Sequence, residues 1–110
     1  MSKVDVNDLV GILKFLDENF LSEEQFSEIC NLNVDEMESQ KLIAQKVLVP
    51  GFNEMNHQTQ EHLISSLREI IDRGMDCSLV FERVNTPFDF SSINHVGFVE
   101  IVYEEICRQR

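Results

Sequence analysis

The sequence has few residues that interrupt helices and few positive charges. Only four glycines and two prolines occur among its 110 residues, and this scarcity favours helical structure. Lysine and arginine total 9 against 20 aspartates and glutamates, which gives a formal net charge of −11 at pH 7. Such a chain repels the phosphate backbone of DNA and RNA, so direct nucleic-acid binding is excluded from the expected functions.

Long apolar runs are missing as well. None approaches the roughly 18 consecutive apolar residues that a transmembrane helix needs, and residues 1–5 lack the charged-then-apolar plan of a signal peptide. We therefore expect a soluble, cytoplasmic protein. With 12.8 kDa and 43% hydrophobic residues, residues 1–110 have the material for a single acidic helical domain with one core.

The cysteines and histidines form no recognised metal or disulfide motif. Cys30, Cys77 and Cys107 are odd in number and widely spaced, so we expect reduced thiols, each packed as a small buried hydrophobe. His57 and Glu61 have the four-residue spacing that a metal site can use, but a solvated pair on a helix explains that spacing equally well. No metal and no cofactor are expected.

Catalytic motifs are scarce too. One pairing of a nucleophile with its base is worth considering, namely Cys77 or Cys107 with His95. The sequence around either cysteine does not resemble a known nucleophile turn. The four glycines are isolated from one another, so no glycine-rich loop is present to hold a phosphate. The sequence therefore predicts a protein that is not an enzyme.

Hydrophobic periodicity predicts an all-α, single-domain bundle of about five to six helices. An apolar stripe predicts a first helix near residues 6–20, with Phe20 on its buried face. Ser22 and Gln25 form a capping-box pattern, so a short helix is expected near residues 23–31. The residues expected to be buried by that helix are Phe26, Ile29 and Cys30.

The middle of the chain contains one expected helix and one expected break. Asn33 is a candidate N-cap for a helix that runs to about Leu48. Pro50 and Gly51 then predict a loop over Val49-Pro50-Gly51-Phe52, because proline restricts the residue before it and glycine permits a turn.

Three more helices are expected in the second half. The most regular pattern covers residues 57–73, with Gly74 placed to terminate the helix. A short helix capped by Ser78 should run to Val84. The last helix should run from Ser92 to Cys107, although residues 97–103 are also rich in strand-favouring side chains. The alternative is an α+β fold with a short strand near 97–103.

Negative charge is concentrated in the first third of the chain. Residues 1–40 carry a net charge of −8, whereas residues 41–110 carry −3. Repulsion within such a surface costs stability, so we expect it to steer a basic partner protein. The alternative is a solvated surface whose acids favour helix N-termini. The candidate partner-binding residues are Asp17, Glu18, Glu23, Glu24, Glu28, Asp35, Glu36 and Glu38.

The acidic region from Asp17 to Glu38, the unpaired thiols and the helical segment Leu63–Ile71 together resemble the small immunity proteins that bacteria encode beside polymorphic toxins, in particular those of contact-dependent growth inhibition systems. The resemblance implies a tight one-to-one complex with a basic toxin domain, a ribonuclease in the first place or a deoxyribonuclease. We expect the acidic surface to occupy the toxin's substrate-binding face. The adjacent tyrosine pair of nuclease-colicin immunity proteins is absent, since Tyr103 is the single tyrosine.

An adaptor or chaperone is the alternative function. Such a protein would bind its partner through an apolar helix face. The candidate anchors are Phe88, Phe90 and Phe98.

Overall fold

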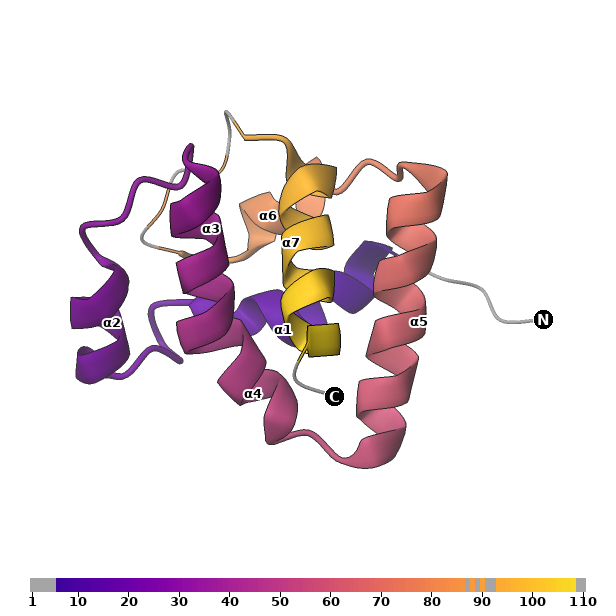
Figure 1. Cartoon of the computed structure of the whole chain (residues 1–110), viewed down its shortest axis with the longest axis horizontal. Coiled ribbons are helices and arrows are strands. Elements are labelled where there is room, and N and C mark those ends of the chain that lie inside the picture. Colours follow the sequence, from indigo (N-terminus) through magenta and orange to yellow (C-terminus); the bar gives the residue numbers. More distant parts are fainter. Residues whose placement is uncertain (1–5, 87, 89, 91–92, 109–110) are drawn as a thin grey trace.

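The computed structural model describes residues 6–86, 88, 90 and 93–108 (Figure 1). Within these ranges the chain forms six continuous helical segments and no strand. The expected all-α bundle is confirmed. The alternative strand near residues 97–103 is wrong, because helix α7 (His95–Arg108) runs through all of them.

The first segment is a helix of mixed type that ends earlier than expected. It consists of a 3₁₀ turn (Val6–Leu9), helix α1 (Val10–Leu13) and a second 3₁₀ turn (Lys14–Leu16). Asp17 is extended, with φ −65° and ψ 137°, and its carboxylate accepts the backbone N–H of Asn19 at 2.9 Å. This turn ends the helix, so Phe20 lies outside it and is 56% exposed.

Helix α2 (Glu23–Ile29) begins with the predicted capping box. The Ser22 hydroxyl accepts the Gln25 N–H at 3.1 Å, and the Gln25 side chain accepts the Ser22 N–H at 3.2 Å. The expected burial is correct only for Ile29, since Phe26 and Cys30 are exposed. A helix of seven residues covers the core with one face only, and Ile29 occupies that face.

Helices α3 (Met37–Ile43) and α4 (Val49–Asn53) form one continuous helical stretch, joined by a π-helical segment (Ala44–Leu48). The loop expected at residues 49–52 is therefore wrong. The N-cap expected at Asn33 is also wrong: its side chain accepts the Asp35 N–H at 3.0 Å in a turn, and α3 begins after Glu36.

The π-helical segment explains how the helix continues through Pro50. In this segment the Val49 N–H donates to the Ala44 carbonyl, five residues back, which makes the turn wider than in an α-helix. Pro50 then stands in the first turn of α4. At that position the missing N–H and the fixed φ of proline are tolerated.

Gly51 is required by packing and not by a turn. A Cβ at this position would lie 2.6 Å from Cδ2 of the Phe15 ring, so Gly51→Ala forces the ring or the helix to move. We expect a loss of about 1–2 kcal/mol in the free energy of unfolding, measured by urea denaturation. The control is Gly11→Ala, where a Cβ meets nothing within 4 Å and we expect no loss. Equal unfolding midpoints for the two variants would contradict this account.

The remaining helices have local caps. Helix α5 (His57–Arg73) is confirmed, with Asn56 accepting the Thr59 N–H at 2.8 Å and Gly74 at φ 60°.

Helix α6 (Ser78–Arg83) has Cys77 at its N-cap position without a side-chain cap hydrogen bond, so the cap predicted at Ser78 is wrong. The Asp76 carboxylate accepts the Ser78 N–H at 3.0 Å and its hydroxyl at 2.8 Å. These two hydrogen bonds lower the pKa of Asp76. Asn94 accepts the Gly97 N–H in the first turn of α7, and the predicted start at Ser92 lies outside the described residues.

The helices surround one core, and α2 lies at its edge (Figure 1). Helix α7 packs against α3, α4 and α5, while α2 packs on the π-helical segment. None of the helices in the described ranges is long and apolar enough to cross a membrane. The largest fully buried apolar side chains are Phe52, Phe98, Leu9, Ile12, Leu16, Ile29, Ile43, Leu48, Leu67, Ile70 and Ile106.

Candidate protein-binding surface

The segment from Asp17 to Glu38 combines strong negative charge with exposure. It contains eight acidic residues and no lysine, arginine or histidine. All eight acidic side chains reach the surface, seven of them exposed and Asp17 half-buried. The segment comprises the connection before α2, α2 itself, and the connection to the first turn of α3.

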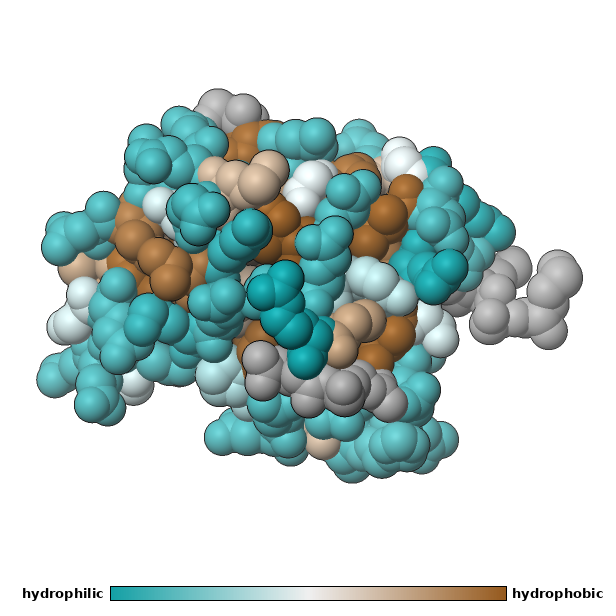
Figure 2. All heavy atoms as spheres, in the orientation of Figure 1, coloured by the Kyte–Doolittle hydropathy of each residue, from teal (hydrophilic) through white to brown (hydrophobic). Residues whose placement is uncertain are grey.

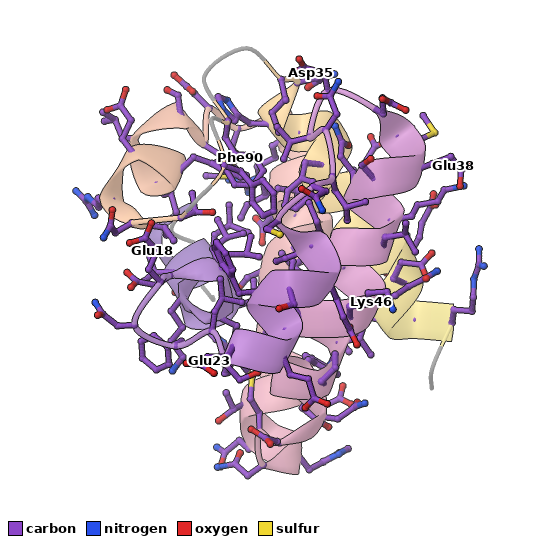
Figure 3. All side chains as sticks on the ribbon, turned by 90° about the vertical axis from the view of Figure 1, so that its left-hand side faces the viewer. Glu18, Glu23, Asp35, Glu38, Lys46 and Phe90 are labelled. Atoms are coloured by element: carbon purple, nitrogen blue, oxygen red, sulfur yellow. The ribbon has the colours of Figure 1, made fainter. Side chains whose placement is uncertain are left out.

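Glu18, Glu23, Asp35 and Glu38 lie on one side of the molecule but in two groups (Figure 3). Glu18 and Glu23 lie near the beginning of α2, and both line one shallow groove. Asp35 and Glu38 lie beyond the other end of α2, at the start of α3. The structure therefore brings Glu18 and Glu23 together and separates them from Asp35 and Glu38.

Some of these carboxylates already have partners. Glu28 lies 3.5 Å from the Lys46 ammonium, and Glu38 lies 3.9 Å from Lys41. Asp17 has a structural role, because its carboxylate accepts N–H groups of Asn19 and of Asn85, which follows α6. Among the described residues, no ion pair involves Glu18, Glu23, Glu24 or Glu36.

Exposed aromatic rings accompany the first group of carboxylates. Phe20 is 56% and Phe26 is 42% exposed. Phe26 lines the groove that contains Glu18 and Glu23, and Phe20 lines a second groove together with Gln25. We define the α2 surface as Glu18, Phe20, Glu23, Glu24, Phe26 and Glu28.

Sequence reasoning missed both rings of the α2 surface, because it placed them on buried helix faces. The available signal was the shortness of α2, which cannot bury residues on two of its sides.

The candidate anchors of the adaptor alternative are buried and not exposed. Phe98 is fully buried, Phe90 is 5% exposed, and Phe88 packs on Phe90 with ring centroids 6.0 Å apart. These three aromatic residues belong to the core.

Among the described residues, no hydrogen bond joins a cysteine thiol to His95. Cys77 is buried, whereas Cys30 and Cys107 are exposed, so the expected burial is wrong for two of the three. Burial raises the pKa of the Cys77 thiol, which disfavours the reactive thiolate. The His95 ring stacks on Phe81 at 4.6 Å, and its Nε2 lies 2.8 Å from the Phe90 carbonyl oxygen.

Asp8, His62 and Ser66 form a small polar cluster where the first segment meets α5. The Asp8 carboxylate accepts the Ser66 hydroxyl at 3.0 Å and lies 3.6 Å from Nε2 of His62. A nucleophilic triad needs the imidazole between the hydroxyl and the carboxylate. Here the carboxylate lies between the hydroxyl and the imidazole, so the cluster connects the first segment to α5 and does not form a triad.

The histidines also do not gather into a metal site. His57 and Glu61 form the exposed pair that their spacing indicates, with 3.8 Å between Nε2 and the carboxylate. Over the described part of the chain, no three His, Cys, Asp or Glu side chains lie close enough together to hold a metal ion.

Comparisons with known protein families, curated proteins and solved structures found no match to this chain. The fold and the α2 surface define a small acidic helical protein in which α2 and the residues just before it carry both exposed carboxylates and exposed aromatic rings.

Proposed function

We propose that this protein binds and neutralises a cationic toxin domain, as an immunity protein does, and that the α2 surface is its recognition site. The observation that carries the proposal is the exposure of Phe20 and of Phe26, the second of which shares a groove with Glu18 and Glu23. Neither of these two carboxylates has an ion-pair partner among the described residues. Protein interfaces combine a few aromatic anchors with a polar rim. Exposed phenyl rings do not contribute to hydration, so a surface that serves only to keep the protein hydrated does not explain them.

The expected mechanism is occlusion of the toxin's substrate-binding face. A nuclease holds the phosphates of its substrate with lysine and arginine, and carboxylates accept hydrogen bonds from the same side chains. The negative field speeds the encounter of the two proteins. Once Phe20 and Phe26 exclude water from the contact, each ion pair becomes stronger because the local dielectric constant falls. The complex is expected to contain one copy of each protein.

An adaptor that bound through the α2 surface, and not through the anchors Phe88, Phe90 and Phe98 considered above, would make a different prediction. An adaptor that used Phe20 and Phe26 alone would associate at a rate nearly independent of ionic strength, because apolar contacts are not screened by salt. An immunity protein that uses the carboxylates should associate fastest at low salt. The salt dependence of the association rate therefore distinguishes the two functions.

The test begins with capture of the partner from the native strain, followed by kinetics with purified proteins. We expect Glu23→Lys combined with Glu24→Lys to reduce the association rate about tenfold or more at low salt, and to remove protection of cells that express the toxin. The control is Glu61→Lys with Asp72→Lys, which changes the net charge equally on α5, at the opposite end of the molecule from α2 (Figure 1).

Thermal melting of both variants verifies that the fold is intact. Equal protection by the two variants, with association rates indifferent to salt, would show that Glu23 and Glu24 are ordinary solvated residues and would refute the proposal. A captured partner without a basic surface would also refute it.

A further inference from the structure

Glu105 is the one charged side chain that is buried within the described part of the chain. It is 2% exposed and lies in the last part of α7, whose other buried residues are all apolar. The strip of hydrophobic residues between α3 and α7 shows how apolar this side of α7 is (Figure 2). A carboxylate in such surroundings costs free energy unless hydrogen bonds satisfy it.

The hydrogen-bond partner of this carboxylate belongs to the π-helical segment. Gln45 Nε2 donates to Oε1 of Glu105 at 2.8 Å, although 60 positions separate the two residues in the sequence. The other oxygen, Oε2, lies 3.9 Å from Arg108, whose side chain is 67% exposed, so solvent weakens that ion pair. The carboxylate is thus held within the chain itself, and its close contact is with Gln45.

This contact fixes how the π-helical segment is rotated about its axis. The segment is wider than an α-helical turn, because the Val49 N–H donates to the Ala44 carbonyl five residues back. Pro50 favours the wide turn, since it has no N–H to donate to the carbonyl four residues back. The proline does not determine which side of the segment faces α7. The hydrogen bond between Gln45 and Glu105 does so.

Helix α2 depends on the same segment for its position. Only Ile29 of its seven residues is buried, the helix packs on the π-helical segment, and Glu28 lies 3.5 Å from Lys46. Lys46 directly follows Gln45, and consecutive residues of a helix point to different sides. Gln45 therefore reaches α7 while Lys46 reaches α2, and the segment lies between these two helices (Figure 1).

We propose that Glu105 is a positioning residue for the α2 surface. Its carboxylate holds Gln45, this contact fixes the rotation of the π-helical segment, and the segment holds α2 so that Glu23 and Phe26 face the partner. The effect on the position of α2 is independent of the proposed function, whereas the effect on partner binding rests on it. Replacing buried charges by apolar side chains of similar volume is often neutral or stabilising, so Glu105 contributes a specific arrangement and not stability.

The test removes the carboxylate and follows α2 by amide hydrogen exchange in the whole protein, measured by NMR. Glu105→Met removes the acceptor and keeps an unbranched side chain, while the exposed Gln45 gains water as its partner. The Cys30 N–H, which donates to the Phe26 carbonyl at 2.8 Å, should exchange at least about tenfold faster. Amides of α5 should exchange no faster than before, and the urea midpoint should be unchanged or higher.

Two variants serve as matched controls. Glu105→Gln keeps an acceptor for Gln45 and removes only the charge, so exchange in α2 should stay within about threefold of that of the unaltered protein. Glu104→Met makes the apolar substitution at the preceding, exposed position and should leave α2 unchanged. Gln45→Ala combined with Glu105→Met should match Glu105→Met alone, because both substitutions remove the same hydrogen bond.

Partner binding should weaken at least about fivefold in Glu105→Met and recover in Glu105→Gln. Unchanged exchange of α2 in Glu105→Met would overturn the proposal. A lower urea midpoint with equal acceleration in α2 and α5 would also overturn it, because Glu105 would then stabilise the whole fold. The exchange measurements contain no toxin, so a protein that binds no toxin would refute the proposed function and leave their result standing.

Discussion

Phe98→Ala is expected to lower the free energy of unfolding by about 3–5 kcal/mol. Phe98 is fully buried, and its ring centroid lies 5.3 Å from that of Phe90 and 5.9 Å from that of Phe81. Truncation removes both aromatic contacts and leaves a cavity that the surrounding helices can fill only in part. Since small domains are stable by about 5–15 kcal/mol, urea unfolding should show a large shift of the midpoint.

The matched control is Phe26→Ala, which removes the same side chain from an exposed position on α2. Phe26 is 42% exposed, so we expect a change below about 1 kcal/mol. Similar destabilisation by the two variants would contradict the distinction between core and surface aromatics. A stable Phe98→Ala protein that failed only in partner binding would support the adaptor with Phe98 as an anchor.

The parts of the fold that could be predicted from sequence are those fixed by local chemistry. Helix α5 begins at an asparagine cap and ends at a glycine in the left-handed region, and both signals lie within a turn of the helix that they delimit. The capping box of Ser22 and Gln25 is equally local. For these elements the sequence neighbourhood contains all the groups that form the hydrogen bonds.

The wrong predictions involve distant contacts. The local sequence at Pro50 and Gly51 indicates a turn, but the π-helical segment before these residues accommodates the proline within a helix. The glycine is needed because the ring of Phe15, from another segment of the chain, lies against it. The burial predicted for Phe20 and Phe26 is wrong for a similar reason. A hydrophobic pattern does not reveal which side of a short helix meets the core.

The candidate surface was predictable only in part. The excess of acid in residues 17–38 is visible in the sequence, whereas its division into two groups depends on how α2 and α3 are placed. Glu105 falls in the less acidic part of the chain, so the charge pattern does not single it out. Only the packing of α7 against the π-helical segment brings its carboxylate to Gln45.

Phe20→Ala combined with Phe26→Ala is expected to weaken partner binding about a hundredfold or more. Aromatic anchors at the centre of an interface commonly cost about 2 kcal/mol or more each when truncated, and about 1.4 kcal/mol corresponds to a tenfold change in affinity. The two effects need not add, because both rings flank the same helix. Stability should change little, since Phe20 is 56% and Phe26 is 42% exposed in the free protein.

Leu79→Ala provides the control for the anchors. Leu79 is 67% exposed and lies on α6, outside the α2 surface. The Leu79→Ala substitution removes exposed apolar area without removing an anchor. The affinity of this variant for the partner should therefore stay within about threefold of that of the unaltered protein.

The most direct test of the central claim is the Kd of the captured partner for the unaltered protein, for the Phe20 and Phe26 double variant and for Leu79→Ala, measured by calorimetry at one salt concentration. The account predicts a loss of about a hundredfold or more for the double variant and nearly unchanged affinity for Leu79→Ala. Unchanged affinity of the double variant, with its fold intact by circular dichroism, would contradict the claim that the α2 surface is the recognition site.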